Sequence, residues 1–288
     1  MKVVISGASG FVGRNVLSLL NKYPNDYEIV SLDITTGFDL TDKTHCDTIT
    51  DFDVFVHLAN LAYVPASYKN PEQFYSLNYT TTLNALELCR KFQAKFIYIS
   101  SYIYGHPKYL PIDENHPVNP FNPYAQTKVI CESMCEGYNR DFKIPIIILR
   151  PFNIYGIGQS GNQLISEIIR QVKRGNDIIS LKDQFPKRDY INVTDVASGI
   201  KTSIDNSDNS SLGIYNLCSG ISYSVFEITE ILKSLIKSNL QFVFKGSDRP
   251  NEVNETKGTY EKIRNELGWK PSVKFVDGLK SIVKHEEL

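Results

Sequence analysis

The chain has 288 residues and carries 31 basic and 32 acidic side chains, so its formal net charge is −1. Hydrophobic residues make up 42% of the chain, which is too much for a disordered protein and is typical of a globular one. The even charge balance offers no basic footprint for nucleic acid and no polybasic patch for a membrane surface. A chain of this length predicts one large domain, or one core with a smaller lobe.

Five cysteines are scattered along the chain, and their odd number argues against a disulfide framework. Cys131 and Cys135 lie four residues apart on a predicted helix, but no Cys or His pair complements them, so two packed thiols are favoured over a metal site. The N-terminus shows no signal peptide, and no apolar run approaches the roughly 18 residues that a membrane span needs. We therefore expect a cytoplasmic protein.

The first half alternates short apolar runs with segments of helical spacing. The predicted strands are Val3–Ser6, Glu28–Leu32, Val54–Leu58, Lys95–Ser100 and Ile144–Leu149, and the predicted helices are Phe11–Tyr23, Pro71–Phe92 and Pro123–Phe142. Strands that are apolar on both faces and separated by helices indicate a parallel sheet covered on both sides. The sequence therefore predicts an α/β fold with a Rossmann-type doubly wound parallel sheet.

The regular alternation of apolar runs and helical segments ends after residue 150, and the predicted elements become shorter. They are a glycine-rich loop at Gly156–Gly161, helices at Asn162–Arg174, Asp195–Ile204, Val225–Ser238, Tyr260–Leu267 and Val276–His285, strands at Asp189–Val193 and Tyr215–Leu217, and polar connections at Asn206–Ser211 and Gly246–Gly258. We expect a core at residues 1–150 and a smaller C-terminal α/β lobe at residues 151–288, interleaved with that core.

Gly7, Gly10 and Gly13 lie between the first predicted strand and the first predicted helix. Glycines there permit a tight turn and a close approach to a pyrophosphate, and the helix N-terminus offers unpaired N–H groups to phosphates. Asp33 follows Gly13 by 20 residues at a strand end, where a carboxylate can accept both ribose hydroxyls, although a strand-end cap would also explain it. Because Asp33 would repel a 2′-phosphate, NAD(H) is favoured, with NADP(H) as the alternative through Arg14.

Two further dipeptides are candidates for the dinucleotide. Asp39 and Leu40 could meet the adenine, although a helix N-cap explains Asp39 equally well. Leu58 and Ala59 end the third predicted strand at the carboxyl edge of the sheet, where ligands bind in such folds.

Tyr124 and Lys128 lie four residues apart near the start of a predicted helix, so they share one helix face. A phenol has a pKa of about 10, and a nearby ammonium lowers that pKa by stabilising the phenolate. Such a Tyr can exchange a proton with an alcohol oxygen while a hydride moves to or from a nicotinamide. Ser100 and Ser101 supply the accompanying hydroxyl at the end of an earlier strand, although strand-end polarity would also explain both serines.

The motifs occur in a fixed order along the chain. The segments are Gly7–Gly13, Asp33, His57–Asn60, Asn78, Ser100–Gly105, Tyr124–Lys128 and Arg150–Gly156, followed by Arg188–Ala197, Tyr215–Gly220, Arg249–Glu252 and Leu267–Pro271. In this order they resemble the extended short-chain dehydrogenase/reductases of the NAD-dependent epimerase/dehydratase type, which act on nucleotide sugars. The resemblance covers nearly the whole chain.

The resemblance implies a role for each matched residue. Tyr124 would be the general acid/base, Lys128 would hold the nicotinamide ribose and tune Tyr124, and Ser100, which lies four residues before Tyr104 as in the family, would hydrogen-bond the reacting oxygen. The other residues implied at the cofactor are Phe11, Val12, Asn78 and Pro151, and those at the nucleotide-diphosphate sugar are Ser101, Tyr102, Asn153, Arg188 and Arg249. The core would then bind the dinucleotide and the lobe mainly the nucleotide sugar. A homodimer through the helices of Asn78 and Tyr124 is also implied.

Three reactions share this machinery: 4-epimerisation, 4,6-dehydration and reduction of a 4-keto sugar. Dehydration is disfavoured because Ser101 and Tyr102 stand where the dehydratases carry an Asp-Glu pair. Only 20 residues separate Asp33 from Asp53, too few for the extra strand–helix unit common in the epimerases. A 4-keto-6-deoxy-sugar reductase is therefore preferred, with a 4-epimerase that keeps its NAD bound as a close alternative. A non-catalytic dinucleotide-binding protein is disfavoured because the Ser, Tyr and Lys are all retained.

Overall fold

The computed structural model describes residues 1–160, 163–206, 212–236, 239–246 and 252–288. Its largest feature is a six-stranded parallel sheet in the order β2-β1-β3-β4-β5-β9. The strands are β1 (Lys2–Ser6), β2 (Glu28–Leu32), β3 (Val54–His57), β4 (Lys95–Ile99), β5 (Ile146–Pro151) and β9 (Leu212–Leu217). This arrangement confirms the predicted doubly wound α/β fold.

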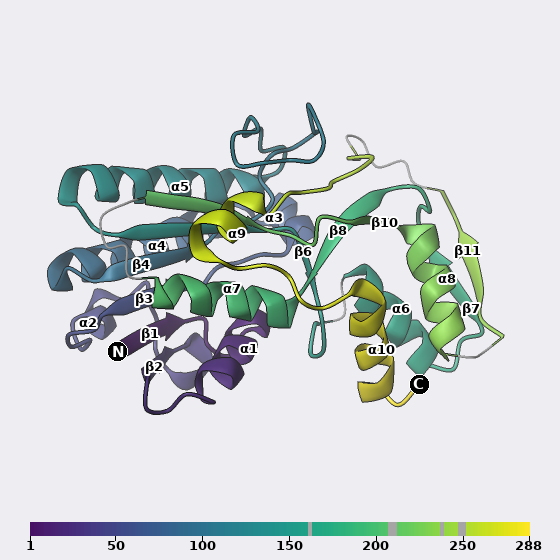
Figure 1. The fold of residues 1–288 in the computed structure, drawn as a ribbon, viewed down its shortest axis with the longest axis horizontal. Helices are drawn as coiled ribbons and strands as arrows, with labels where there is room; N and C mark the ends of the chain where they lie inside the picture. Colours follow the sequence, from purple (N-terminus) through teal and green to yellow (C-terminus); the bar gives the residue numbers. More distant parts are fainter. Residues whose placement is uncertain (161–162, 207–211, 237–238, 247–251) are drawn as a thin grey trace.

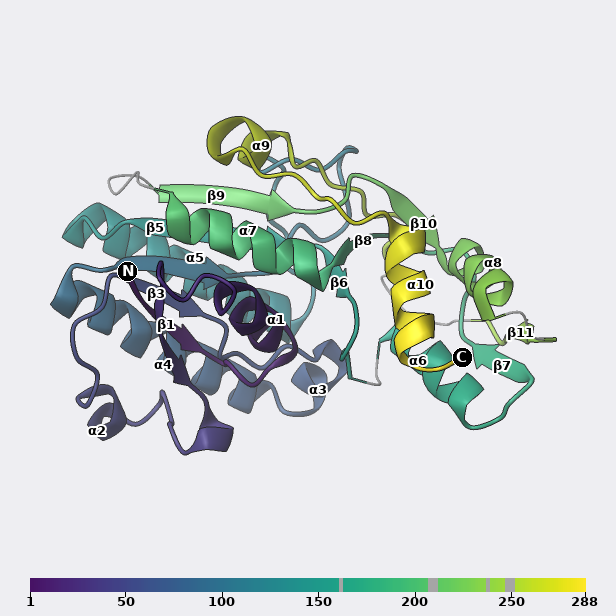
Figure 2. The ribbon, with the colours of Figure 1, turned by 60° about the horizontal axis from the view of Figure 1, so that its bottom comes forward.

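Helices cover both faces of this sheet (Figures 1 and 2). One layer holds α1 (Phe11–Leu20) and α7 (Val193–Asp205), and the other holds α4 (Pro71–Phe92) and α5 (Pro123–Phe142). Successive side chains of a strand point to opposite faces, so β3 sends Val54 and Val56 into the first core and Phe55 into the second. This need for an apolar residue at every strand position explains the unbroken apolar runs.

A smaller group of elements follows β5 along the chain, and most of it lies toward the right of Figure 1. It contains a three-stranded sheet in the order β10-β8-β6 and a two-stranded sheet of β11 and β7. The elements are β6 (Asn153–Tyr155), β7 (Ile178–Leu181), β8 (Lys187–Asn192), β10 (Ser222–Ser224), β11 (Gln241–Phe244), α6 (Leu164–Lys173), α8 (Val225–Ile236), α9 (Glu261–Leu267) and α10 (Phe275–His285). Apart from α9, they surround a third core that includes Ile168, Leu232 and Phe275.

The predicted division of the chain at residue 150 stays a prediction. The strand β5 runs across that position, and both β9 and α7 come from the second half of the chain but belong to the large sheet and its helical layer.

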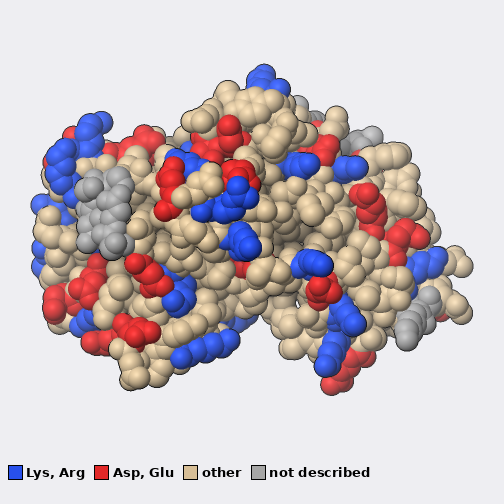
Figure 3. All heavy atoms as spheres, in the orientation of Figure 1, with Lys and Arg blue, Asp and Glu red and all other residues tan. Residues whose placement is uncertain are grey.

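Figure 3 shows basic and acidic side chains interspersed over the face in view. Among the described residues, no helix combines the length and the apolar character needed to cross a bilayer.

Most predicted elements lie within a few residues of their observed bounds, and α4 and α5 match theirs. Val193 was predicted to end a strand but instead begins α7, because Asn192 caps that helix by accepting the backbone N–H of Thr194. The sequence did not predict β6, β7, β10 or β11, which are only three or four residues long. Parts of both predicted polar connections, residues 207–211 and 247–251, lie outside the described residues.

The connection from β2 to β3 is short, as the sequence predicted. It holds a single 3-10 turn, η1 (Ile34–Thr36), and a one-turn helix, α2 (Lys43–Cys46). The structure describes every residue of this segment, and it contains no further strand. A third short helix, α3 (Val64–Lys69), precedes α4.

Candidate active site

The glycine loop connects β1 to α1 at the carboxyl edge of the large sheet. Gly7 adopts a left-handed conformation with φ of 71°, and a Cβ there would lie 2.7 Å from the backbone of both Leu58 and Ala59. A Cβ on Gly13 would overlap the carbonyl oxygen of Gly7 and lie 2.6 Å from that of Ala8. Glycine is therefore required at both positions for steric reasons, and the loop packs directly against the end of β3.

Asp33 joins the glycine loop to the end of β2. Its Oδ2 accepts the backbone N–H of Ser9 at 2.9 Å, and its Oδ1 accepts the backbone N–H and the hydroxyl of Thr35 at 3.0 and 2.7 Å. Burial alone would raise the pKa of Asp33, but the hydrogen bonds from Thr35 and Ser9 lower it, so the group is a carboxylate at neutral pH. Asp33 thus caps η1 and also lies beside the candidate phosphate loop.

Arg14 lies at the same edge and donates to the carbonyl oxygens of Ser9 at 2.9 Å and Gly158 at 3.3 Å. Asp39 does not cap α2, because the N-cap of that helix is Asp42. Its Oδ1 instead accepts the backbone N–H of Thr41 at 2.8 Å, which closes a turn before the helix. Leu40 is buried in the core, and its carbonyl oxygen accepts a hydrogen bond from Asn84.

The structure brings Lys128 and the residues that follow β4 together. The α5 helix starts where Asn122 caps it by accepting the backbone N–H of Ala125. One turn later, the Lys128 ammonium donates to the carbonyl oxygen of Ile99 at 2.7 Å, directly before Ser100. The Lys128 Nζ lies 5.9 Å from the centroid of the Tyr124 ring. Lys128 thus joins the helix of the predicted acid/base to the strand end that carries the serines.

The two serines differ in their contacts. The Ser101 side chain acts on the Tyr124 phenol and lowers its pKa. The Ser100 side-chain oxygen is buried and has no hydrogen-bond partner among the described residues. A buried hydroxyl without a partner is costly, so this group is available to a ligand oxygen.

The electrostatics differ in one respect from the prediction. Burial lowers the pKa of Lys128 to about 8, whereas burial raises the pKa of Tyr124 against the effect of the Ser101 side chain. The pKa of Tyr124 is therefore raised overall by burial, and its tuning by Lys128 stays a prediction. The ammonium is engaged by the Ile99 carbonyl and lies closer to the ring of Tyr98, 4.7 Å from its centroid, than to the Tyr124 ring.

Asn78 lies behind this site and is fully buried. Its Oδ1 accepts the backbone N–H of Leu61 at 2.8 Å, and its Nδ2 donates to the Leu61 carbonyl at 3.2 Å and to the Thr127 hydroxyl at 2.9 Å. These contacts tie α4 to the segment after β3 and to α5. No signal in the sequence pointed to Thr127 as the partner, because the contact spans 49 residues.

Arg188 lies on β8, and its guanidinium contacts two backbone carbonyls and one carboxylate. Its Nη1 donates to the carbonyl oxygens of Lys187 at 2.8 Å and Val253 at 2.6 Å, and its Nη2 forms an ion pair with Glu252. The pKa of the Tyr102 phenol is raised overall, because the effect of burial exceeds the opposing effect of the Arg188 charge. The second predicted arginine, Arg249, lies outside the described residues.

The other predicted substrate and cofactor residues lie at the ends of strands. Tyr102 donates its hydroxyl to the carbonyl of Gly105 at 2.6 Å, and its ring packs edge-on against Phe152. Pro151 ends β5 and pairs with Leu217, while Asn153 begins β6. The structure thus brings the glycine loop, Asp33, the serines, Tyr124 and Lys128 to one edge of the sheet.

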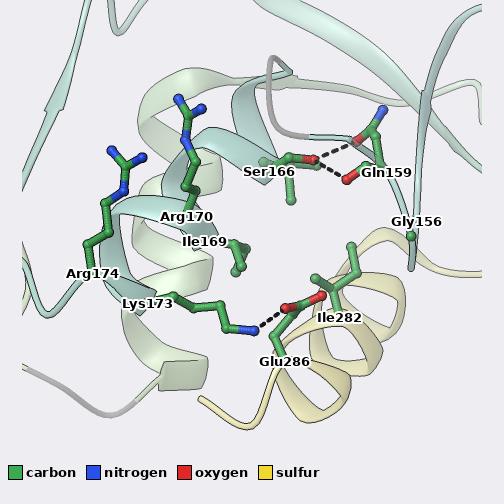
Figure 4. A pocket seen from close by; sticks show the side chains of 11 residues that line it. Gly156, Gln159, Ser166, Ile169, Arg170, Lys173, Arg174, Ile282 and Glu286 are labelled. Atoms are coloured by element: carbon green, nitrogen blue, oxygen red, sulfur yellow. Dashed lines mark hydrogen bonds and ion pairs between the residues drawn. The ribbon is translucent and has the colours of Figure 1, made fainter.

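A separate cavity of about 300 Å³ lies between α6 and α10 (Figure 4). Lys173 and Glu286 form an ion pair of 2.7 Å across it, and the Ser166 hydroxyl donates to Gln159. None of the residues predicted at the cofactor or substrate lines this cavity. Three basic side chains, Arg170, Lys173 and Arg174, and one acidic side chain, Glu286, line it, and it lies apart from the candidate site.

Comparison with known proteins agrees with this geometry. The sequence model of the NAD dependent epimerase/dehydratase family matches residues 3–218. The chain belongs to this family. The family resemblance inferred from the motifs is therefore confirmed, and with it the assignment of the chain as an enzyme.

Two relatives and one solved structure show how this family member compares. A Methanocaldococcus jannaschii protein with the name "Putative UDP-glucose 4-epimerase" is 32% identical over 98% of this chain and 97% of its own. The GDP-6-deoxy-D-mannose reductase of Pseudomonas aeruginosa is 28% identical over 99% of this chain and 97% of its own. The structure of RMD from Pseudomonas aeruginosa complexed with NADPH has a TM-score of 0.91 at 27% identity and covers 99% of this chain and 98% of that chain.

Proposed function

We propose that this epimerase/dehydratase family member is an NAD(P)(H)-dependent oxidoreductase that moves a hydride at C4 of a nucleotide-linked hexose. The preferred reaction is reduction of a 4-keto-6-deoxy sugar. The observation that carries the proposal is the grouping of Tyr124, Lys128, Ser101 and the unpartnered Ser100 hydroxyl at the carboxyl edge of the sheet. The relatives named for 4-epimerisation and for sugar reduction support hydride chemistry of this class.

The residues of the glycine loop fit a dinucleotide. The close backbone approach at Gly7 and the N-terminus of α1 suit a pyrophosphate beside Gly10, Phe11 and Val12. The Asp33 carboxylate would accept the ribose hydroxyls, and the remaining residues proposed at the cofactor are Asp39, Leu40, Leu58, Ala59, Asn78, Tyr124, Lys128 and Pro151. NAD(H) is favoured because Asp33 is ionised, and NADP(H) remains the alternative because Arg14 lies at the same edge.

A bound nicotinamide would supply the hydride donor or acceptor. The protein's part is to move a proton at the C4 oxygen and to hold that oxygen in place. In reduction, the Tyr124 phenol is the proton donor, and its raised pKa keeps it protonated until the hydride arrives. Ser100 would donate its free hydroxyl to the same oxygen. The positive charge of Lys128 favours the phenolate that remains after transfer.

The nucleotide sugar would lie between the sheet edge and the smaller group of strands, against Ser101, Tyr102, Asn153, Arg188 and Arg249. Among the described residues, Arg188 uses three of its five N–H donors, and the other two would serve diphosphate oxygens. The ion pair with Glu252 would hold the guanidinium in a fixed orientation. This arrangement supports a substrate with a diphosphate group.

The short connection from β2 to β3 favours the reductase, because it holds only η1 and α2. A 4-epimerase that retains NAD is the second candidate, favoured by the ionised Asp33 and by the name of the Methanocaldococcus jannaschii relative.

Assembly as a homodimer through α4 and α5 is also proposed. Leu86 is fully buried against the sheet and cannot contribute, whereas Leu83 and Ile130 are partly exposed. A monomeric mass in solution would contradict the dimer.

The test is an assay of the purified protein with a panel of 4-keto-6-deoxy nucleotide sugars and NADH or NADPH. Loss of the reduced-nicotinamide absorbance supports the reductase, whereas isomerisation of a UDP-hexose without added cofactor supports the epimerase. Tyr124→Phe should lower kcat by about 10²–10⁴-fold while dinucleotide binding is kept. Tyr138→Phe is the matched control, because this phenol lies on the same helix but hydrogen-bonds Glu87 outside the site. Unchanged turnover in Tyr124→Phe would refute the assigned acid/base.

A further inference from the structure

A buried ion pair lies on the same helix as the proposed acid/base. Glu132 accepts hydrogen bonds from Arg150 Nε at 3.0 Å and from Nη2 at 2.5 Å, and each side chain is only 5% exposed. Glu132 follows Lys128 by one turn of α5 and Tyr124 by two turns. Side chains four residues apart share a helix face, so Tyr124, Lys128 and Glu132 form one stripe along α5.

The ion pair also reaches the segment that carries the serines. Arg150 Nη1 donates to the Tyr104 hydroxyl at 3.0 Å, and that hydroxyl donates to Asn216 Oδ1 at 2.6 Å. Arg150 ends up with its charge matched by one carboxylate and its further donor satisfied. An unpaired buried charge costs far more than a matched pair, so each member is needed to keep the other buried.

Lys128 is surrounded by few charges that could keep it protonated. On its own helix it faces Tyr124, Cys131, Glu132 and Cys135, on β4 it faces the Tyr98 ring and the Ile99 carbonyl, and on β3 it faces His57. Burial and the charge of Lys128 lower the pKa of His57 to about 3, so this imidazole is neutral. Among the described residues, Glu132 is therefore the one carboxylate that acts on the Lys128 ammonium.

We propose that Glu132 is a positioning residue that holds Lys128 in its charged form, and that Arg150 is the buried ion-pair partner that holds the Glu132 carboxylate in place. The consequence for turnover rests on the proposed function, whereas the coupling of Glu132 to Lys128 does not. Burial disfavours the charged form of Lys128. The negative charge of Glu132, one helical turn away, favours that charged form and so opposes the effect of burial. Removing the carboxylate would also leave Arg150 as an uncompensated cation near the same stripe.

The direct test is an NMR titration of the ligand-free protein with ¹³C-labelled lysine Cε, in which the Lys128 signal is identified by its loss in Lys128→Met. The wild type should titrate with a midpoint of about 8. In Glu132→Gln the midpoint should fall by about one pH unit, because an opposite charge at this range is removed. Glu87→Gln, which breaks the exposed Glu87–Arg90 pair on α4, is the matched control and should leave the midpoint unchanged.

A second variant keeps the test valid if Glu132→Gln does not fold. Glu132→Gln/Arg150→Met removes both buried charges, and paired removal of this kind is tolerated far better than loss of one partner. Its Lys128 midpoint should lie between those of Glu132→Gln and the wild type, because Arg150 no longer acts as an unmatched cation. A wild-type midpoint in either folded variant would overturn the proposal.

The pH profile of kcat/KM separates this inference from the proposed function. The alkaline limb should move to lower pH in Glu132→Gln by the same amount as the NMR midpoint. If the NMR midpoint moves and the alkaline limb does not, the inference about Glu132 stands and the assigned role of Lys128 in the reaction fails.

Discussion

Asp189 is a fully buried carboxyl group that joins three segments of the chain. Its Oδ1 accepts from the backbone N–H and the hydroxyl of Ser219 at 2.8 and 2.7 Å. Its Oδ2 accepts from the backbone N–H groups of Gly220 at 2.9 Å and Gly258 at 3.2 Å. These bonds hold β8, and with it the neighbouring Arg188, against two loops. We predict that Asp189→Asn lowers the free energy of unfolding by about 1–3 kcal/mol at neutral pH.

The magnitude follows from the best orientation of the new amide. Its oxygen can still accept from Gly220 and Gly258, and its NH₂ group can donate to the Ser219 hydroxyl, which then serves as an acceptor. The backbone N–H of Ser219 is left without a partner, and a buried unsatisfied donor costs about 1–3 kcal/mol. For a chain of this size each kcal/mol lowers Tm by about 2–4 °C.

The effect of Asp189→Asn should depend on pH. Burial raises the pKa of Asp189 from 3.8 to about 6, although all four hydrogen bonds act to lower it. A carboxyl group with a raised pKa in the folded state stabilises the protein at low pH, and this contribution is lost as pH rises through about 6. The wild type therefore gains about 1 kcal/mol between pH 7 and pH 5 that the Asn variant cannot gain.

The assay is urea unfolding at pH 7 and pH 5, followed by the fluorescence of Trp269, which is buried against α7. The difference between wild type and variant should be larger at pH 5. Asp177→Asn is the control, because Asp177 is exposed and its substitution should change stability by less than about 0.5 kcal/mol. An effect of Asp189→Asn as small as this control, or one that is equal at both pH values, would refute the reasoning.

Three further predictions concern the sheet edge. Gly13→Ala should lower Tm and weaken dinucleotide binding at least tenfold in a fluorescence titration, since the new Cβ would overlap the Gly7 carbonyl; wild-type binding would contradict this. Asn78→Ala should lower the free energy of unfolding by about 1–3 kcal/mol in urea, because the Leu61 backbone N–H loses its acceptor, and an unchanged midpoint would argue against it. Burial lowers the pKa of His57 to about 3, so its imidazole should stay neutral at all higher pH values. Its NMR signal should therefore not titrate near pH 6.5. The stability that this neutral ring contributes is present above pH 6.5 and is lost as pH falls toward 3.

Much of the site could be predicted because its signals are local. The glycines are needed where β1 turns into α1, and Tyr124 and Lys128 share a helix face through their spacing alone. The contacts that complete the site are not local. Asn78 reaches Thr127 across 49 residues, and Lys128 on α5 reaches the Ile99 carbonyl at the end of β4 across 29 residues. The raised pKa of Tyr124 follows from burial, which no spacing in the sequence reveals.

The sequence by itself determined the parallel sheet, its two helical layers and the order of the motifs, because strands buried on both faces and amphipathic helices leave unbroken or periodic apolar patterns. Only the tertiary structure decided the pairing of short strands such as β6 and β10, which carry too few residues for a pattern. It alone decided that Glu132 meets Arg150 and that Asp189 meets Gly258. Buried polar groups take whichever partner the packing brings within reach, and that partner can lie anywhere along the chain.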